Sequence, residues 1–219
     1  MIRAVSSRVF VLAVAAAATF AAHASESDLS PNVRLLNAAR NGDVAGVERC
    51  LEEGASADSR SRIGETALVM ALKKKDDATA RTMLAAGTDV NIAAVNGITA
   101  LMAAAYNGDL EMVRQLLARG ANVAATDRLG KNAMTYAAGQ GHTAVVRALL
   151  AKGVDANAVY RNDLTALMWA AGYGRDETVK ALLDAGARTD LRDNRGKTAE
   201  DIAREGGYAT TVSLLERGK

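Results

Sequence analysis

Cysteine, proline and aromatic residues are scarce in this chain of 219 residues. Cys50 is the only cysteine, so the chain forms no internal disulfide and its fold must be held together by packing alone. There is one proline, and aromatic residues make up 4% of the chain. Alanine and leucine supply most of the apolar content, which favours short, closely packed helices over strands, because strands prefer β-branched and aromatic residues.

Histidine is also scarce, and this limits the enzyme chemistry that the chain can perform. His142 is the only histidine outside the first 24 residues. One histidine and one cysteine cannot supply a His/Cys metal cluster or a convincing nucleophile–base pair. Carboxylates are plentiful, but they lie at turns and helix starts, as Asp109 and Asp176 do, where they favour the positive end of a helix. We therefore expect no catalytic residue, no cofactor and no metal site.

A strong charge imbalance is missing too. The chain has 27 Lys and Arg residues against 25 Asp and Glu residues. The first 24 residues contain Arg3 and Arg8 and no acid, so the charges of the remaining chain balance. Net charge therefore gives no reason to expect binding to nucleic acid or to a membrane surface.

Residues 1–24 have the features of a cleavable signal peptide. Arg3 and Arg8 form a basic start, an apolar run follows from Val9 to Ala22, and Ala22-His23-Ala24 has the small-x-small form that a signal peptidase accepts. We expect cleavage after Ala24, export by the general route, and a periplasmic location if the source is a Gram-negative bacterium. The alternative is an uncleaved membrane anchor, but the apolar run is short for a spanning helix. No membrane span is expected after processing.

Two glycine positions recur along the chain every 33 residues, which indicates an array of repeated units. One opens each unit and the other lies near its end. The opening series is Gly64, Gly97, Gly130 and Gly196, with Asp163 in the place of the missing glycine, and the closing series is Gly54, Gly87, Gly120, Gly153 and Gly186. The predicted units are 28–60, 61–93, 94–126, 127–159, 160–192 and a truncated 193–219. They form one repeat domain at 30–219 after a flexible tail at 25–29.

Each unit is predicted to contain two short helices separated by a turn. A Thr or Asn before the first helix can cap it, namely Thr66, Thr99, Asn132, Thr165 and Thr198. The second helix carries apolar residues three and four positions apart, which gives it one buried stripe. Two of these columns are Val47, Ala80, Val113, Val146, Val179 and Val212, and Cys50, Met83, Leu116, Leu149, Leu182 and Leu215. Since Cys50 shares a column with apolar residues, we expect a buried and inert thiol.

Two units carry the pattern T-A-L-M-x-A-A-x-x-G, beginning at Thr99 and Thr165. This pattern resembles the T-P-L-H-x-A-A-x-x-G core of ankyrin repeats, and the resemblance covers nearly all of the chain after residue 24. It implies an all-α repeat solenoid of helix-turn-helix units, with a hairpin-like finger loop between units. It also implies that His142 has a structural role at the start of a second helix. Alanine replaces the family's proline, and the family's histidine is replaced by Val69, Met102, Thr135, Met168 and Asp201.

In ankyrin repeat proteins the finger tips and the outer edge of the first helix line a concave face that binds other proteins. The corresponding positions in this chain are rich in Lys and Arg, include tyrosines and hold one acid, Glu65. Such a groove suits an acidic protein surface, because cations steer the approach and aromatic rings anchor the contact. The alternative is that these are ordinary solubilising charges. The predicted partner-binding residues are Arg62, Lys73, Lys74, Asn96, Tyr106, Asn107, Arg128, Leu129, Lys131, Arg161, Asn162, Tyr173 and Arg195.

Two further features near these positions have a structural explanation. Tyr136 and Trp169 occupy a position that is usually core in the family, so we expect them chiefly to pack, with the edge of Trp169 open to the groove as the alternative. The charge block that runs from Lys73 to Asp77 replaces the turn glycine of the second unit, and we interpret it as a solvated helix end.

The resemblance implies a non-enzymatic scaffold for protein–protein interaction. Exported bacterial ankyrin proteins similar to this one support or restrain an enzyme of the cell envelope; a stabiliser of an oxidative-stress enzyme and an inhibitor of a wall-cutting enzyme both fit. We expect a monomer that binds a protein with an acidic surface through the basic concave groove. A secreted effector that acts on host proteins, and a hydrolase that uses a carboxylate pair, are the alternatives.

Overall fold

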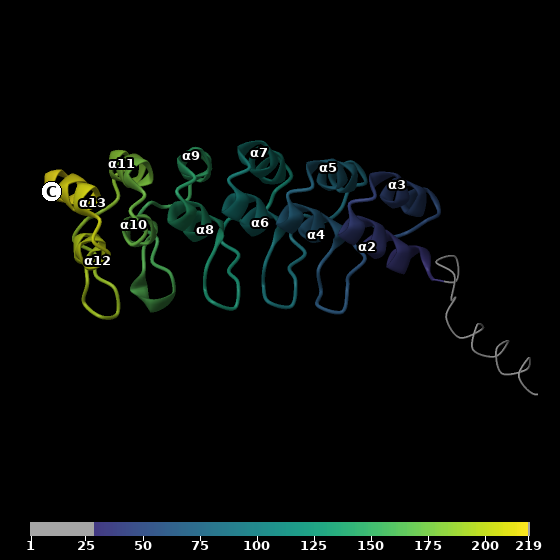
Figure 1. The fold of residues 1–219 in the computed structure, drawn as a ribbon, viewed down its shortest axis with the longest axis horizontal. Coiled ribbons are helices and arrows are strands. Elements are labelled where there is room, and N and C mark those ends of the chain that lie inside the picture. The colour runs from purple at the N-terminus through teal and green to yellow at the C-terminus, as the bar shows by residue number, and fades with distance from the viewer. Residues whose placement is uncertain (1–28, 219) are drawn as a thin grey trace, which may run out of the picture.

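The computed structural model describes residues 29–218, which form two rows of short helices with loops projecting from one side (Figure 1). The inner row lies next to the loops, and the outer row covers its other side. The inner helices are α2 (Pro31–Asn41), α4 (Ala67–Lys74), α6 (Ala100–Asn107), α8 (Ala133–Gln140), α10 (Ala166–Ala171) and α12 (Ala199–Glu205). The outer helices are α3 (Val44–Glu52), α5 (Asp77–Ala85), α7 (Leu110–Ala118), α9 (Thr143–Ala151), α11 (Asp176–Asp184) and α13 (Ala209–Arg217).

The predicted all-α solenoid of helix pairs is confirmed for these residues. The predicted signal peptide at 1–24, and residues 25–28 of the predicted tail, lie outside the described residues. None of the helices in the described part combines the length and the apolar character that crossing a membrane requires.

The predicted caps begin the inner helices from α4 onward. The side chain of Thr99 accepts a hydrogen bond from the Met102 amide at 3.3 Å, and the same bond forms at Thr66, Thr165, Thr198 and Asn132. Two residues that replace the repeat's usual histidine complete a capping box. Thr135 accepts from the Asn132 amide at 2.9 Å, and Asp201 accepts from the Thr198 amide at 3.0 Å. These side chains satisfy amides that a helix start leaves free.

The hydrophobic core runs along the whole array between the two rows. The outer-helix residues Val113, Val146 and Val179 have no exposed surface, and the same holds for Leu116, Leu149 and Leu182. The thiol of Cys50 on α3 is buried in the same core as predicted, and burial raises its pKa. Each unit thus buries its stripe against its neighbours, which is how repeat arrays gain stability.

The turn of the second unit confirms the interpretation of its charge block. Lys75 ends α4 with a φ of 60°, in the left-handed region, where the other units use a glycine such as Gly108. The lysine side chain is exposed there, and Asp76 caps the next helix by accepting from the Thr79 amide at 3.1 Å.

The predicted finger loops are hairpin-like. In the third finger the Ala94 amide donates to the Ile98 carbonyl at 2.9 Å, and in the fourth the Asp127 amide donates to the Lys131 carbonyl at 2.8 Å. Neighbouring fingers are joined by a backbone hydrogen bond, such as that from the Arg128 amide to the Asn96 carbonyl at 3.0 Å. The fingers are therefore held in a row beside the inner helices.

A side-chain clamp joins the fingers at their base. The side-chain oxygen Oδ1 of Asn91 accepts from the Asn122 backbone amide at 2.8 Å, while the side-chain nitrogen Nδ2 of Asn91 donates to the Gly120 carbonyl at 3.2 Å. Asn157 makes the same two bonds to the next unit, at 2.7 and 3.0 Å. Ala124 occupies this position in the third unit. The joint between the third and fourth units therefore lacks a clamp of this kind.

The last unit ends the array with more polar side chains than the inner units have. Of the three acids that distinguish it, Glu216 is exposed and Asp201 is half-buried. Glu200 stands where the inner units carry leucine or methionine, and it is buried and forms an ion pair with Arg204 at 2.6 Å. The buried carboxylate of the last unit is thus neutralised by an ion pair within the same helix.

Candidate functional site

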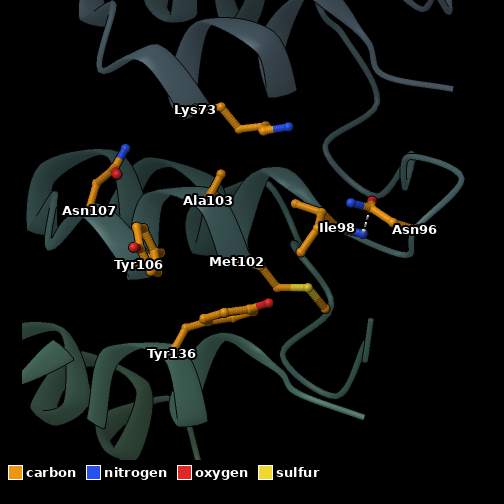
Figure 2. A pocket seen from close by; sticks show the side chains of 8 residues that line it. All are labelled: Lys73, Asn96, Ile98, Met102, Ala103, Tyr106, Asn107 and Tyr136. Carbon is orange, nitrogen blue, oxygen red and sulfur yellow. Dashed lines mark hydrogen bonds between the residues drawn. The ribbon is translucent and has the colours of Figure 1, made fainter. Parts of the chain in front are cut away.

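The inner helices and the fingers form one continuous face, which we call the inner face. Four of the predicted partner-binding residues meet there around a pocket of about 240 Å³, namely Lys73, Asn96, Tyr106 and Asn107. Figure 2 shows that α6 supplies the pocket's centre with Met102, Ala103 and Tyr106, while Tyr136 closes it from α8. Most of the lining is apolar, and Lys73, Asn96 and Asn107 lie on its border.

The pocket exists because one inner-helix position holds a small residue. Met70, Ala103, Tyr136 and Trp169 are equivalent positions of four successive units. Three of them are large, and Ala103 leaves the space that a large side chain would fill. The rings of Tyr106 and Tyr136 form one wall, packed edge to face with their centroids 5.9 Å apart.

A second pocket of about 320 Å³ lies between the fourth and fifth fingers. It brings together four more predicted residues, Leu129, Lys131, Arg161 and Asn162. The fifth finger is irregular: it contains the short helix η2 (Arg161–Asp163), and both Asn162 and Asp163 have left-handed backbone angles. Here the guanidinium of Arg161 donates to the Arg128 carbonyl at 3.1 Å. This side-chain bond joins the two fingers beside the pocket.

Lys131 lies between the two pockets. Its ammonium nitrogen is 4.3 Å from the centroid of the Trp169 ring and 5.7 Å from that of Tyr136, which is cation–π geometry. Trp169 in turn stacks on Tyr173, with centroids 6.2 Å apart and planes 11° apart. Two pairs of aromatic rings from three units, Tyr106–Tyr136 and Trp169–Tyr173, are thus bridged by the ammonium of Lys131.

The buried carboxylate of Asp127, in the same finger as Lys131, already has its hydrogen-bond partners. Asp127 accepts from the Leu129 amide at 2.8 Å, from the Lys131 amide at 2.9 Å and from the Tyr136 hydroxyl at 2.5 Å. Burial raises the pKa of Tyr136, and its bond to Asp127 raises that pKa further. Tyr136 therefore stays protonated near neutral pH and keeps donating to Asp127, which holds both its ring and the finger in place.

The predicted cations fall into two groups. Lys73 is paired with Glu65 at 2.6 Å, Arg195 is paired with Asp193 at 2.7 Å, and Lys74 donates to the Arg40 carbonyl. Like Lys74, the four cations of the fingers, Arg62, Arg128, Lys131 and Arg161, take part in no ion pair within residues 29–218. Four of the five predicted cations without an ion pair therefore lie on the fingers.

Two residues of the site were expected to serve mainly as core. Tyr136 and Trp169 are only half-buried, and each lines one of the two pockets. Trp169 therefore packs against the core, as expected, and also lines a pocket, as the alternative had it; Tyr136 likewise lines a pocket. The sequence does contain an indication of this: at one equivalent position of successive units, Tyr136 and Trp169 follow the much smaller Ala103.

The residues considered for chemistry have structural roles. The His142 ring nitrogen Nε2 lies 2.9 Å from the Tyr106 carbonyl oxygen, and the residue precedes α9, as the structural interpretation predicted. Within the described part of the chain, no three His, Cys, Asp or Glu residues are grouped so that they could hold a metal ion.

Comparisons with known proteins agree with this architecture. The family model described as ankyrin repeats (three copies) matches residues 35–127, 72–160, 102–193 and 134–219. The crystal structure of EF0377, an ankyrin repeat protein, has a TM-score of 0.76 and 29% sequence identity to the chain, and the match covers 84% of this chain and 96% of that one. No curated protein matches the chain.

Proposed function

The chain belongs to the ankyrin repeat family, and from this premise we propose that it is an exported, non-enzymatic scaffold that binds another protein through its inner face. Ankyrin repeats generally serve as a non-catalytic module for protein–protein interaction. We propose further that the partner presents an acidic surface and that the scaffold acts as a monomer in the cell envelope.

The observation that carries this proposal is the set of unpaired finger cations next to exposed aromatic rings. Tyr106 and Tyr173 are each about half exposed, at 51% and 50%, and Lys131 lies between them on the inner face. Large aromatic residues and arginines are the side chains that most often carry binding energy in protein interfaces. Unpaired cations beside them favour a partner of opposite charge and increase the rate of its association.

The location and the effect on the partner rest on the sequence. The predicted signal peptide at 1–24 supports export, and a Gram-negative source would make the compartment the periplasm. In that compartment we propose that the scaffold modulates an envelope enzyme, as a stabiliser or as an inhibitor. Sequencing the N-terminus of the protein from fractionated cells should give Ser25 in the soluble envelope fraction. An N-terminus at Met1 in the inner membrane would contradict export by cleavage.

The binding proposal is tested by affinity capture from an envelope extract with the mature protein as bait. We expect at least one acidic partner, whose capture falls when Arg128→Glu, Lys131→Glu and Arg161→Glu are combined. The matched control combines Arg81→Glu, Arg114→Glu and Arg147→Glu, which make the same charge change at exposed positions of the outer helices. Capture that is lost equally with both triple variants, or with neither, would refute the assignment to the inner face.

A further inference from the structure

We infer that the inner face recognises an acidic segment of its partner through two adjacent subsites, one for an apolar side chain and one for a carboxylate. The apolar subsite is the pocket around Ala103, between Tyr106 and Tyr136. The carboxylate subsite is the pocket formed by Lys131, Arg161 and Trp169. This inference rests on the proposed function and specifies the chemistry of the segment that the scaffold binds.

The apolar subsite has the size and the lining that an aliphatic or aromatic side chain needs. A cavity of about 150 Å³ lined by apolar groups is large enough to bind benzene. The pocket at Ala103 measures about 240 Å³, and its lining includes Ile98, Met102 and the two tyrosine rings. The side chains in Figure 2 surround this space from α6 and α8, and the ammonium of Lys73 at its border is already paired with Glu65. We therefore expect a leucine, isoleucine, methionine or phenylalanine of the partner to be partly buried here.

The carboxylate subsite offers donors that the described part of the chain does not satisfy. The Lys131 ammonium has three protons that can be donated. The face of the Trp169 ring attracts this cation but is not a directed hydrogen-bond acceptor, so the protons stay available to a carboxylate. Arg161 uses one guanidinium nitrogen to reach the Arg128 carbonyl, and its other donors face no carboxylate in the described residues. Asp127 already accepts three hydrogen bonds. A carboxylate brought by the partner would form charge-assisted hydrogen bonds, which are stronger than neutral ones.

The two subsites are close enough to be used by one segment. Tyr136 lines the apolar subsite, and the Lys131 ammonium that serves the carboxylate subsite lies 5.7 Å from the Tyr136 centroid. Since Lys131 contacts the rings of both subsites, one short stretch of chain can place an apolar side chain in the first and an aspartate or glutamate at the second. This pairing of chemistries favours an acidic, partly apolar segment of protein over a uniformly charged ligand.

The probe for this inference is a displayed library of random peptides, selected against the mature protein. We expect the selected peptides to combine aspartate or glutamate with leucine, isoleucine, methionine or phenylalanine. One selected peptide, made synthetically, is then titrated while the fluorescence of Trp169 is recorded. Trp169 is the only tryptophan of the chain. Because Lys131 lies over its ring, carboxylate binding should change the emission.

Two substitutions in the peptide and two in the protein identify the subsites separately. Changing the peptide's acid to its amide, or its apolar residue to alanine, should each weaken binding about tenfold. Ala103→Met should fill the apolar subsite, and the buried Met70 at the equivalent position of the second unit shows that the array accommodates this residue. Lys131→Gln should remove the preference for the acid over its amide. Arg147→Gln, on an outer helix, is the matched control and should leave the affinity unchanged.

The outcomes separate this inference from the proposed function. Selected peptides without acids, or full affinity in Ala103→Met for the peptide with its apolar residue, would overturn the two-subsite inference. The proposed function would still stand if reversing the finger charges weakened capture of the natural partner. Thermal unfolding shows whether Ala103→Met still folds. If it does not, the apolar subsite is tested by the peptide alone: equal affinities of the selected peptide and of its alanine variant for the natural protein would overturn it.

Discussion

Two sets of equivalent residues, one on the outer helices and one on the inner helices, differ in burial and in how much they vary between units. The outer-helix column contains Val113, Val146 and Val179, and all three are fully buried. The inner-helix column contains Ala103, Tyr136 and Trp169, which differ in size from unit to unit and line the two pockets of the inner face. Positions that repeat hold the units together, and positions that vary shape the surface where a partner can bind.

The joints between fingers show the same contrast on a smaller scale. Asn91 and Asn157 repeat one clamp, whereas Ala124 leaves it out at the joint between the third and fourth units. This joint is the one between the two units that contribute Tyr106 and Tyr136 to the apolar pocket. The departure from the repeat therefore falls between the two units whose tyrosines line that pocket.

The largest expected effect tests the comparison at a repeated position. Leu149→Ala removes a fully buried side chain and leaves a cavity, so we expect the free energy of unfolding to fall by about 3 kcal/mol. Tyr173→Ala changes a half-exposed residue of the inner face, and its loss should stay below about 1 kcal/mol. Urea unfolding followed by circular dichroism measures both. Similar losses for the two variants would mean that the inner face is also part of the scaffold.

A smaller effect is expected at the clamps, and it can be tested in both directions. Asn157→Ala removes two hydrogen bonds to the next unit, which should cost about 1–2 kcal/mol of unfolding free energy. Ala124→Asn supplies the missing side chain in an equivalent turn and should add about 1 kcal/mol. Ala124→Ser is the control, since its shorter side chain cannot make both bonds. A neutral or destabilising result for Ala124→Asn would show that this joint is not equivalent to the others.

Much of the scaffold could be predicted from the sequence because each feature recurs in register. The 33-residue spacing predicted the helix pairs, and the caps at Thr99 and Asn132 follow from residue type and position. The pockets could not be derived in this way, since they depend on which side chains of different units lie next to each other. Tyr136 was expected to be buried because its repeat position is usually part of the core. It is partly exposed because Ala103 of the neighbouring unit leaves space beside it. The predicted boundaries of the units, and the assignment of the partner-binding residues, remain predictions.

The smallest effect concerns two capping boxes that differ in charge. The box of α8 uses the neutral side chains of Asn132 and Thr135, while that of α12 uses the carboxylate of Asp201. The hydrogen bonds that this carboxylate accepts from the Thr198 amide and hydroxyl lower its pKa. A carboxyl group whose pKa is lower in the folded chain stabilises it above the unfolded value of about 3.9, and that stabilisation is lost as the pH falls through the folded value.

Asp201→Asn should therefore lower stability slightly at neutral pH and make the decrease from about pH 6 to about pH 3 shallower than in the natural chain. Thr135→Ala in the neutral box should lower stability by the same amount at both ends of that range, because none of the groups it affects titrates there. Urea unfolding at several pH values measures the two slopes. If Asp201→Asn leaves the slope unchanged while Thr135→Ala alters it, the acid sensitivity of the array does not arise from its charged terminal cap.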